Sequence, residues 1–223
     1  MMGLPFAREV VPYLWFAALV FGLPGLVFIY FRHRRVGLGL LAVMVLFGAY
    51  MLFFFRDPPR IPPDDPSLVL AGADGKIMGV TRVQDDTHLK TEAVRISIFL
   101  SLLDVHINRA PIPGKVTSLG YHPGKRYFTF QEKSSDYNQH SSILIENDRL
   151  ACLVKQIVGP VARRVVYWLE IDQQLQAGDR IGLMKFGSRL DIFLPAADVT
   201  VLVQPGDRVS AGITPVARIN PVE

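Results

Sequence analysis

Two long uncharged segments, residues 11–31 and 36–55, make up most of the first quarter of the chain. Each is close to the roughly 20 residues with which an α-helix crosses the hydrocarbon core of a bilayer. The short basic sequence Arg32-His33-Arg34-Arg35 separates them. This pattern predicts a helical membrane hairpin over residues 1–56, and the second apolar segment argues against a cleaved signal peptide.

The charges around the hairpin do not fix its orientation. By the positive-inside rule the basic connector favours the cytoplasm, which would put the rest of the chain on the opposite face. Arg56 and Arg60, which follow the hairpin, favour the reverse. A shallow hairpin inserted from one side would not obey the rule at all, so the alternatives stay open.

After the hairpin the pattern changes to short apolar runs. Residues 57–66 contain five prolines, too many for a helix or a central strand, and are expected to form a stiff linker. Beyond them, runs rich in β-branched and aromatic residues are separated by Gly, Pro and Asp at residues 93–103, 142–145, 150–157 and 163–169. We therefore expect one β-rich domain over residues 67–223.

Turn sequences recur within this domain. Asp74-Gly75-Lys76-Ile77 is similar to Pro113-Gly114-Lys115-Val116, and Ala177-Gly178-Asp179-Arg180-Ile181 is similar to Pro205-Gly206-Asp207-Arg208-Val209. Such turns resemble those of biotinyl and lipoyl carrier domains. The resemblance implies a mainly β fold with a flattened β-barrel or sandwich body, whose exposed hairpin would carry Gly187-Ser188. Common β-turns without such a relation are the alternative.

Composition excludes several functions. The net charge is only +4, and dense basic tracts interleaved with aromatic residues are absent, so nucleic-acid binding is not expected. The single cysteine, Cys152, cannot form an internal disulfide, and its apolar neighbours predict a packed strand position. No CxxC or HExxH motif occurs, so no metal is expected.

The clearest chemical signal is the sequence Phe186-Gly187-Ser188-Arg189. A serine hydroxyl can attack the carbonyl carbon of the preceding residue and replace the amide with an ester. Gly-Ser pairs also occur in many turns. Together with segments in the same order, however, this one resembles the processing site of the phosphatidylserine decarboxylase proenzymes, in particular the short bacterial form. Those segments are Phe55-Arg56-Asp57-Pro58, Ala73-Asp74-Gly75-Lys76-Ile77, Asp104-Val105-His106-Ile107-Asn108-Arg109-Ala110-Pro111 and Gln156-Ile157-Val158-Gly159-Pro160-Val161-Ala162-Arg163-Arg164.

The resemblance implies self-cleavage between Gly187 and Ser188 into a large β chain, residues 1–187, and a small α chain, residues 188–223, which stay together as a heterodimer. Ser188 would become a covalent pyruvoyl (pyruvic acid) cofactor, an electron sink in place of pyridoxal phosphate. The enzyme would decarboxylate phosphatidylserine to phosphatidylethanolamine through a Schiff base. Its phospholipid substrate would lie in the cell inner membrane, with the catalytic domain in the cytoplasm.

His106 is the candidate acid-base group for this chemistry. The resemblance supplies a first histidine that matches His106, but the second histidine of the longer enzymes, three positions later, is replaced by Arg109. The base for self-cleavage is therefore left open. Asp74 matches the family's triad aspartate, or it is a turn aspartate that accepts backbone N–H bonds before Gly75.

Other polar residues keep two interpretations. His140 could supply the missing imidazole, although a solvated loop is the favoured interpretation. Arg163 and Arg164 could bind a lipid phosphate or carboxylate, although a solvated surface is the favoured interpretation. Strand alternation points Arg189 away from Ser188. No substrate-binding residue is predicted.

Two other functions compete with the decarboxylase. The first is a membrane-tethered, carrier-like adaptor without catalysis, in which Gly187-Ser188 only turns the chain. The second is a pyruvoyl enzyme that acts on a soluble amino acid, against which the membrane hairpin argues.

Overall fold

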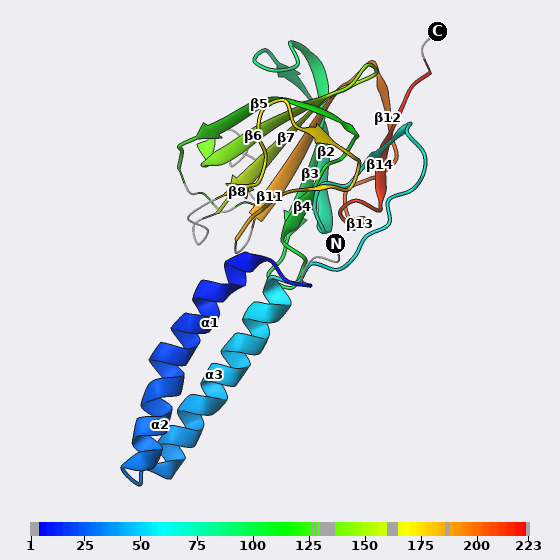
Figure 1. The fold of residues 1–223 in the computed structure, drawn as a ribbon. Helices are drawn as coiled ribbons and strands as arrows, with labels where there is room; N and C mark the ends of the chain where they lie inside the picture. Colours follow the sequence, from blue (N-terminus) through cyan, green and yellow to red (C-terminus); the bar gives the residue numbers. More distant parts are fainter. Residues whose placement is uncertain are drawn as a thin grey trace. The chain divides into compact units, whose positions relative to one another are not determined.

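The computed structural model describes residues 5–125, 127, 129, 137–159, 165–185 and 188–221. Contacts between residues divide the chain into two compact units, Met1–Pro59 and Arg60–Glu223 (Figure 1). The division falls inside the proline-rich segment at residues 57–66.

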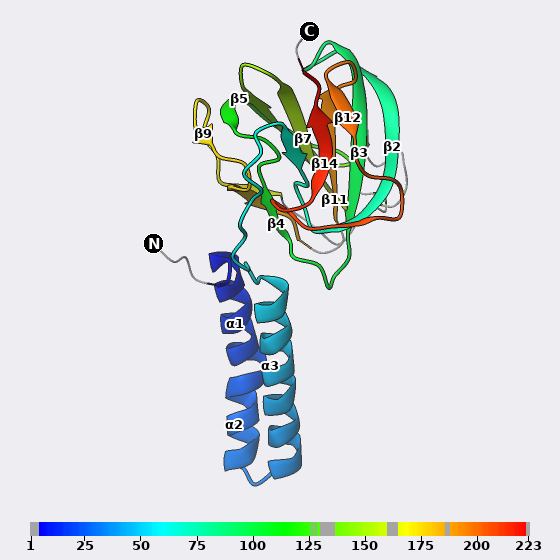
Figure 2. The same cartoon turned by 90° about the vertical axis from the view of Figure 1, so that its right-hand side faces the viewer.

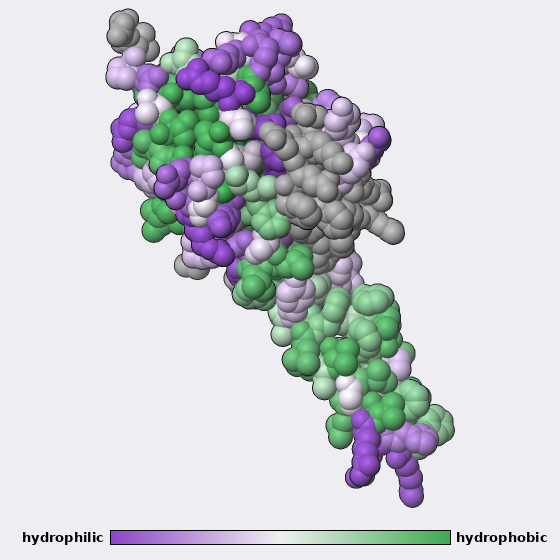
Figure 3. Space-filling model, turned by 180° about the vertical axis from the view of Figure 1, so that it is seen from behind, coloured by the Kyte–Doolittle hydropathy of each residue, from purple (hydrophilic) through white to green (hydrophobic). Residues whose placement is uncertain are grey.

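The first unit is a pair of helices joined by a tight turn. Both helical stretches, Arg8–Tyr30 and Arg34–Phe54, are long and apolar enough to cross a membrane. Figure 3 shows apolar side chains along the hairpin and hydrophilic ones at its tip. In chain order the helices are η1 (Arg8–Val10), α1 (Val11–Ala17), the π-helical turn η2 (Ala18–Gly22), α2 (Leu23–Tyr30) and α3 (Arg34–Phe54).

Two local features explain the shape of the hairpin. The π-helical turn ends two residues before Pro24, whose ring would clash with the carbonyl four residues earlier in a regular α-helix; the wider turn accommodates the proline without ending the helix. A Cβ atom on Gly37 would lie 2.5 Å from the carbonyl oxygen of Gly25. The backbones of the two helices therefore approach closely near the turn, as small residues permit in membranes.

The named strands of the second unit pair in antiparallel β-sheets (Figures 1 and 2). One sheet has eight strands in the order β13-β2-β3-β11-β7-β6-β5-β9, and two smaller sheets have the orders β1-β14-β12 and β4-β10-β8. The strands are β1 (Leu68–Leu70), β2 (Gly75–Asp85), β3 (Thr91–Leu100), β4 (Ile107–Arg109), β5 (Gly114–His122), β6 (His140–Glu146), β7 (Ala151–Val158), β8 (Val166–Tyr167), β9 (Gln174–Leu175), β10 (Arg180–Leu183), β11 (Ser188–Pro195), β12 (Val199–Val201), β13 (Arg208–Val209) and β14 (Pro215–Ile219).

A single core cluster joins all three sheets, because it contains Val69 of β1, Ile181 of β10 and Ile192 of β11. The large sheet curls around this core, and the two small sheets supply the facing residues. The predicted fold class is therefore confirmed: a mainly β, flattened barrel-like body follows a pair of apolar helices. Cys152, on β7, is fully buried in the same cluster, as its apolar neighbours predict.

The recurring glycine turns occupy matching places in the large sheet. Gly75 opens β2 and Gly114 opens β5, and a Cβ atom on either would collide with a carbonyl oxygen of the next strand, that of Phe99 or Glu146. Read inward from its two edges, the sheet has the series β13-β2-β3-β11 and β9-β5-β6-β7. The two halves therefore correspond, and the repeated turns of the sequence mark an internal structural repeat.

Candidate active site

One end of the body's interior is lined by polar side chains. On β11, Leu190 belongs to the main core, so Ser188, two residues earlier on the same strand, faces the interior as well. Gln156 of β7 pairs with Leu190, and Ser141 of β6 pairs with Gln156. Ser188, Gln156 and Ser141 are all fully buried. The apolar core therefore ends in a group of hydroxyl and amide side chains on neighbouring strands.

Ser188 is the first residue of β11 and pairs with Leu100 of β3 and Val158 of β7. Its Oγ lies 3.4 Å from the carbonyl oxygen of Lys185, a long hydrogen bond. Gly187, the other residue of the predicted cleavage site, lies outside the described residues, as does Phe186.

The prediction that Ser188 lies on an exposed hairpin is wrong. The strand before it, β10, and its own strand, β11, belong to different sheets, so they are not the two arms of a hairpin. Alternation along β11 then buries Ser188 on the face of the core residues Leu190 and Ile192.

Two connections place His106 at the same end of the body as Ser188. The loop at residues 101–105 connects Leu100, the strand partner of Ser188, to His106. The backbone carbonyl of His106 also accepts a 3.2 Å hydrogen bond from the N–H of Met184, at the start of the segment that leads to Ser188.

The His106 ring is oriented by its own loop. Its Nδ1 lies 2.9 Å from the carbonyl oxygen of Asp104, which can only accept, so Nδ1 carries the proton and donates. In the neutral ring the lone pair is then on Nε2. The carboxylate of Asp104 fixes the loop, since it accepts hydrogen bonds from the N–H and Oγ of Ser101 at 2.8 and 2.7 Å. His106 itself is fully buried.

Asp74 makes long-range contacts. Its Oδ2 lies 2.7 Å from Nη2 of Arg60, and its Oδ1 accepts a 2.7 Å hydrogen bond from the N–H of Ala211. The carboxylate thus ties the first residue of the body to the segment before β14. Within the described part of the chain, the hydrogen bonds found for Asp74 involve these two residues and not His106.

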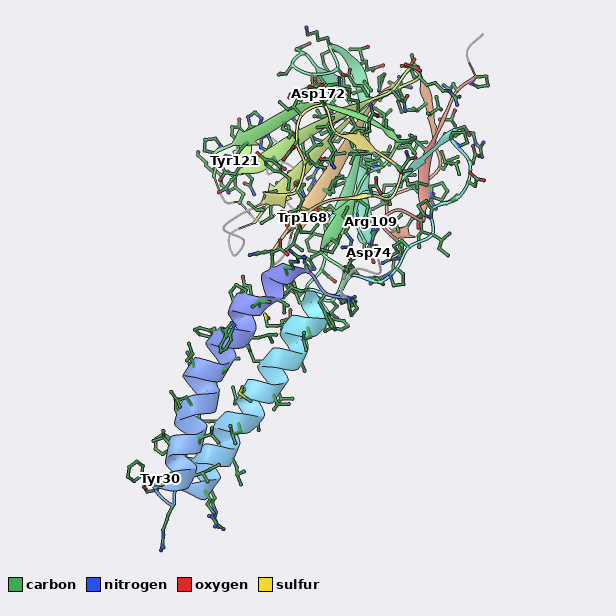
Figure 4. The ribbon with its side chains drawn as sticks, viewed as in Figure 1. Tyr30, Asp74, Arg109, Tyr121, Trp168 and Asp172 are labelled. Atoms are coloured by element: carbon green, nitrogen blue, oxygen red, sulfur yellow. The ribbon has the colours of Figure 1, made fainter. Side chains whose placement is uncertain are left out.

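Arg109, which the resemblance aligns with a second histidine, is buried at the same end of the body as Asp74 (Figure 4). Its Nη1 donates a 2.9 Å hydrogen bond to the carbonyl oxygen of Gly178. A Cβ atom on Gly212, next to the Asp74 partner Ala211, would lie 3.1 Å from its Cδ. The guanidinium is therefore held by the backbone of a turn.

Two further candidates lie on the outer face of the large sheet. His140 is the first residue of β6, so the prediction of a loop is wrong; its ring stacks on His122 with centroids 4.6 Å apart. Its neighbour Ser141 faces the interior, so alternation directs His140 away from Ser188. Arg189 bonds Asp191 at 2.7 Å, and the predicted orientation away from Ser188 is confirmed. Arg163 and Arg164 lie outside the described residues.

The sequence reasoning missed a chain of buried polar groups beside Ser188. Ser141 Oγ donates to Oε1 of Gln156 at 2.7 Å, and Nε2 of Gln156 donates to Oδ1 of Asn108 at 2.7 Å. All three side chains are fully or almost fully buried. The available signal was the presence of Gln156 and Asn108 within apolar runs, at positions where strand alternation requires core residues.

The described residues contain no group of three or more His, Cys, Asp or Glu side chains that could hold a metal ion. The polar end of the interior instead offers hydroxyl, amide and imidazole groups around a serine. Such a set suits acyl transfer and proton transfer.

Comparison with known proteins identifies relatives over almost the whole chain. A family profile described as phosphatidylserine decarboxylase matches residues 47–217. A protein of Desulfotalea psychrophila named phosphatidylserine decarboxylase proenzyme is 39% identical over 217 residues, which cover 96% of this chain and 97% of that protein.

Proteins of the same name from Carboxydothermus hydrogenoformans and Pelodictyon phaeoclathratiforme are 44% identical over 182 residues and 42% identical over 186 residues. They cover 82% and 83% of this chain, and 84% and 83% of their own lengths. With a family profile over most of its length and relatives of this identity, the chain belongs to the phosphatidylserine decarboxylase family.

Proposed function

We propose that this chain is the precursor of a membrane-bound enzyme that decarboxylates phosphatidylserine to phosphatidylethanolamine. Membership of the family is the observation that carries the proposal. The burial of Ser188 beside neutral polar groups supports it, because a site closed to bulk water protects a reactive ester from hydrolysis. We place the enzyme in the inner membrane, with its body in the cytoplasm.

The chain's own residues carry out the processing. Ser188 Oγ attacks the carbonyl carbon of Gly187 while a base takes its proton; the C–N bond then breaks, and the released amine of Ser188 gains a proton. The product is an ester between residues 187 and 188. Loss of the Ser188 α-hydrogen expels the Gly187 carboxylate, and hydrolysis of the remaining enamine releases ammonia and leaves a pyruvoyl group. The chain is then cut into residues 1–187 and residues 188–223.

A pyruvoyl group supplies a ketone carbonyl that condenses with a primary amine and withdraws electrons from the neighbouring carbon atom. The surroundings of Ser188 fit this group, because a ketone and its adjacent amide are neutral acceptors and Ser141, Gln156 and Asn108 are neutral polar groups. At the start of β11, Ser188 is held between β3 and β7 in the middle of the large sheet.

We assign proton transfer to His106. Its Nδ1 donates to the Asp104 carbonyl, so Nε2 is the atom that can take and return a proton. Asp74 remains a candidate for the self-cleavage step. Its contacts with Arg60 and Ala211 suggest that it acts by holding the body together rather than by touching His106.

Apolar surface beside the site supports a lipid substrate. Leu102 and Leu103 are 48% and 67% exposed on the loop that connects the strand partner of Ser188 to His106. Acyl chains would contact such a loop favourably. The two apolar helices that precede the body would keep the enzyme at the bilayer that contains its substrate.

The experiment is to express the full chain with its membrane and measure fragment masses and lipid decarboxylation. Wild type should yield two chains that meet at residues 187 and 188. Ser188→Ala should remain one chain and release no carbon dioxide. Ser118→Ala, on β5, is the matched control and should behave like wild type. An intact wild-type chain without activity would instead support the carrier-like adaptor, and activity on free amino acids but not on lipid would support the soluble-substrate enzyme.

A further inference from the structure

Among the residues that the structure describes, the buried side-chain nitrogen of Asn108 finds no hydrogen-bond acceptor. Asn108 is fully buried, so solvent does not satisfy its Nδ2 either. Leaving a buried donor unpaired costs stability, and native proteins seldom do so without a reason.

Hydrogen bonding fixes which way this nitrogen points. Ser141 donates its hydroxyl to Oε1 of Gln156, so Nε2 of Gln156 faces Asn108. Asn108 must present its oxygen to that nitrogen, because a flipped amide would place two donors against each other. In the hydrogen-bond relay of the structure, Nδ2 of Asn108 is therefore turned away from Gln156.

The donor lies close to the reaction centre in the sheet register. His106 directly precedes β4, and Asn108, two residues later, is the middle residue of that strand; both side chains are fully buried. Gln156 precedes by two residues Val158, the strand partner of Ser188. Asn108 is thus the end of the relay at the polar end of the interior, where Ser188 and His106 also lie.

We propose that Nδ2 of Asn108 donates to the carboxylate of the substrate head group in the processed enzyme, with Gln156 and Ser141 as positioning residues. This inference rests on the proposed decarboxylase function. An amide NH2 only donates, so its partner must be a hydrogen-bond acceptor, such as a carboxylate oxygen, and not the ammonium of the head group.

A neutral donor suits this carboxylate better than a cation. The carboxylate loses its charge as carbon dioxide leaves, so a guanidinium or ammonium would stabilise the substrate more than the transition state and slow the reaction. The two arginines nearest to the site in sequence are held elsewhere, Arg109 by the carbonyl of Gly178 and Arg189 by Asp191 on the outer face. Within the described part of the chain, neither of these two arginines is therefore in place to compete with the amide for the carboxylate.

The test uses Asn108→Asp and Asn108→Leu in the full chain, with phosphatidylserine as substrate and phosphatidylethanolamine as inhibitor. Asn108→Asp replaces the donor with an acceptor, and Asn108→Leu removes it at similar volume. Both should still break between residues 187 and 188, but kcat/KM should fall about 10- to 100-fold, as expected for a lost hydrogen bond to a charged group. The inhibition constant for phosphatidylethanolamine, which lacks the carboxylate, should stay within about twofold of wild type; a general disturbance of the site would raise it in parallel.

Ser141 provides a second, milder pair of variants. Ser141→Ala leaves Gln156 free to turn its amide and should lower kcat/KM by a smaller factor, whereas Ser141→Thr keeps the hydroxyl and should restore it. If both Asn108 variants fail to fold, equal kcat/KM for these two Ser141 variants would overturn the proposal.

Three other results would overturn it. One is a kcat/KM for Asn108→Leu within about twofold of wild type. Another is an inhibition constant for phosphatidylethanolamine that rises in the Asn108 variants by the same factor as kcat/KM falls. The third is a folded Asn108 variant that stays uncut, which would assign the donor to the Gly187 carbonyl in the precursor. A failure of the decarboxylase function itself would show differently, in a wild-type chain that does not act on the lipid.

Discussion

The ion pair between Arg60 and Asp74 should contribute measurably to the stability of the β body. Its atoms lie 2.7 Å apart, and the two side chains are only 12% and 14% exposed. Breaking a fully buried pair by removing one partner costs about 3–5 kcal/mol, whereas an exposed pair contributes about 0.2–1 kcal/mol. For this largely buried pair we expect Asp74→Asn to lower the free energy of unfolding by about 2–3 kcal/mol.

Asp74→Asn keeps an oxygen that can accept the N–H of Ala211, so the loss reports mainly on the charge pair. For a domain of this size, 1 kcal/mol corresponds to a shift of about 2–4 °C in Tm, so the expected decrease is roughly 5–10 °C. Thermal unfolding of the detergent-solubilised full chain, followed by tryptophan fluorescence, measures it. Trp168 lies in the body and is partly exposed, so its emission should change on unfolding (Figure 4).

A double-mutant cycle with Arg60→Met isolates the pair. If the two side chains act together, the double variant should be little less stable than either single variant, with a coupling of about 1–3 kcal/mol. Strictly additive losses would refute the reasoning. Self-cleavage is measured on the same samples below their Tm to test whether the carboxylate has a chemical role. If it has one, Asp74→Asn should block cleavage and Arg60→Met should not.

Two further predictions concern the ends of β2. Gly75→Ala should lower Tm and slow self-cleavage, because the new Cβ would collide with the carbonyl oxygen of Phe99, which precedes the strand partner of Ser188. Gly79→Ala is the control on the same strand. Its Cβ would enter open space, so this variant should match wild type in both assays. At the other end, burial lowers the pKa of His88. His88 then binds a proton more readily in the unfolded chain than in the folded one. The free energy of unfolding should therefore be highest above pH 6.5, the ordinary pKa of histidine, and should decrease as the pH falls below 6.5. His88→Gln should weaken this dependence between about pH 7 and 5 in urea titrations, and an unchanged slope would contradict it.

The pair of apolar helices, the fold class and the candidate serine could be predicted from local signals. Uncharged segments long enough for a bilayer, and short β-branched runs between turn residues, leave few alternatives at the level of fold class. The burial of Cys152 followed from its apolar neighbours, and the orientation of Arg189 followed from alternation along a strand. The motif around Ser188 is chemical and local, so it is visible without any tertiary structure.

The remaining features depend on contacts between distant segments. Whether the chain turns back or changes sheets before Ser188 depends on the pairing of β11 with β3 and β7, which no local pattern encodes. The relay from Ser141 to Asn108 joins three strands, and each residue looks unremarkable in its own stretch of sequence. His140 lies among polar residues typical of a loop, yet pairing with β7 makes it part of a strand.

The intact mass of the mature protein tests the central claim most directly. The account predicts two chains, residues 1–187 and residues 188–223, with the smaller one lacking a free amino group and lighter than a serine-initiated chain of the same sequence. A single chain of 24.9 kDa with an unmodified serine at position 188, in a preparation that decarboxylates the lipid, would contradict it.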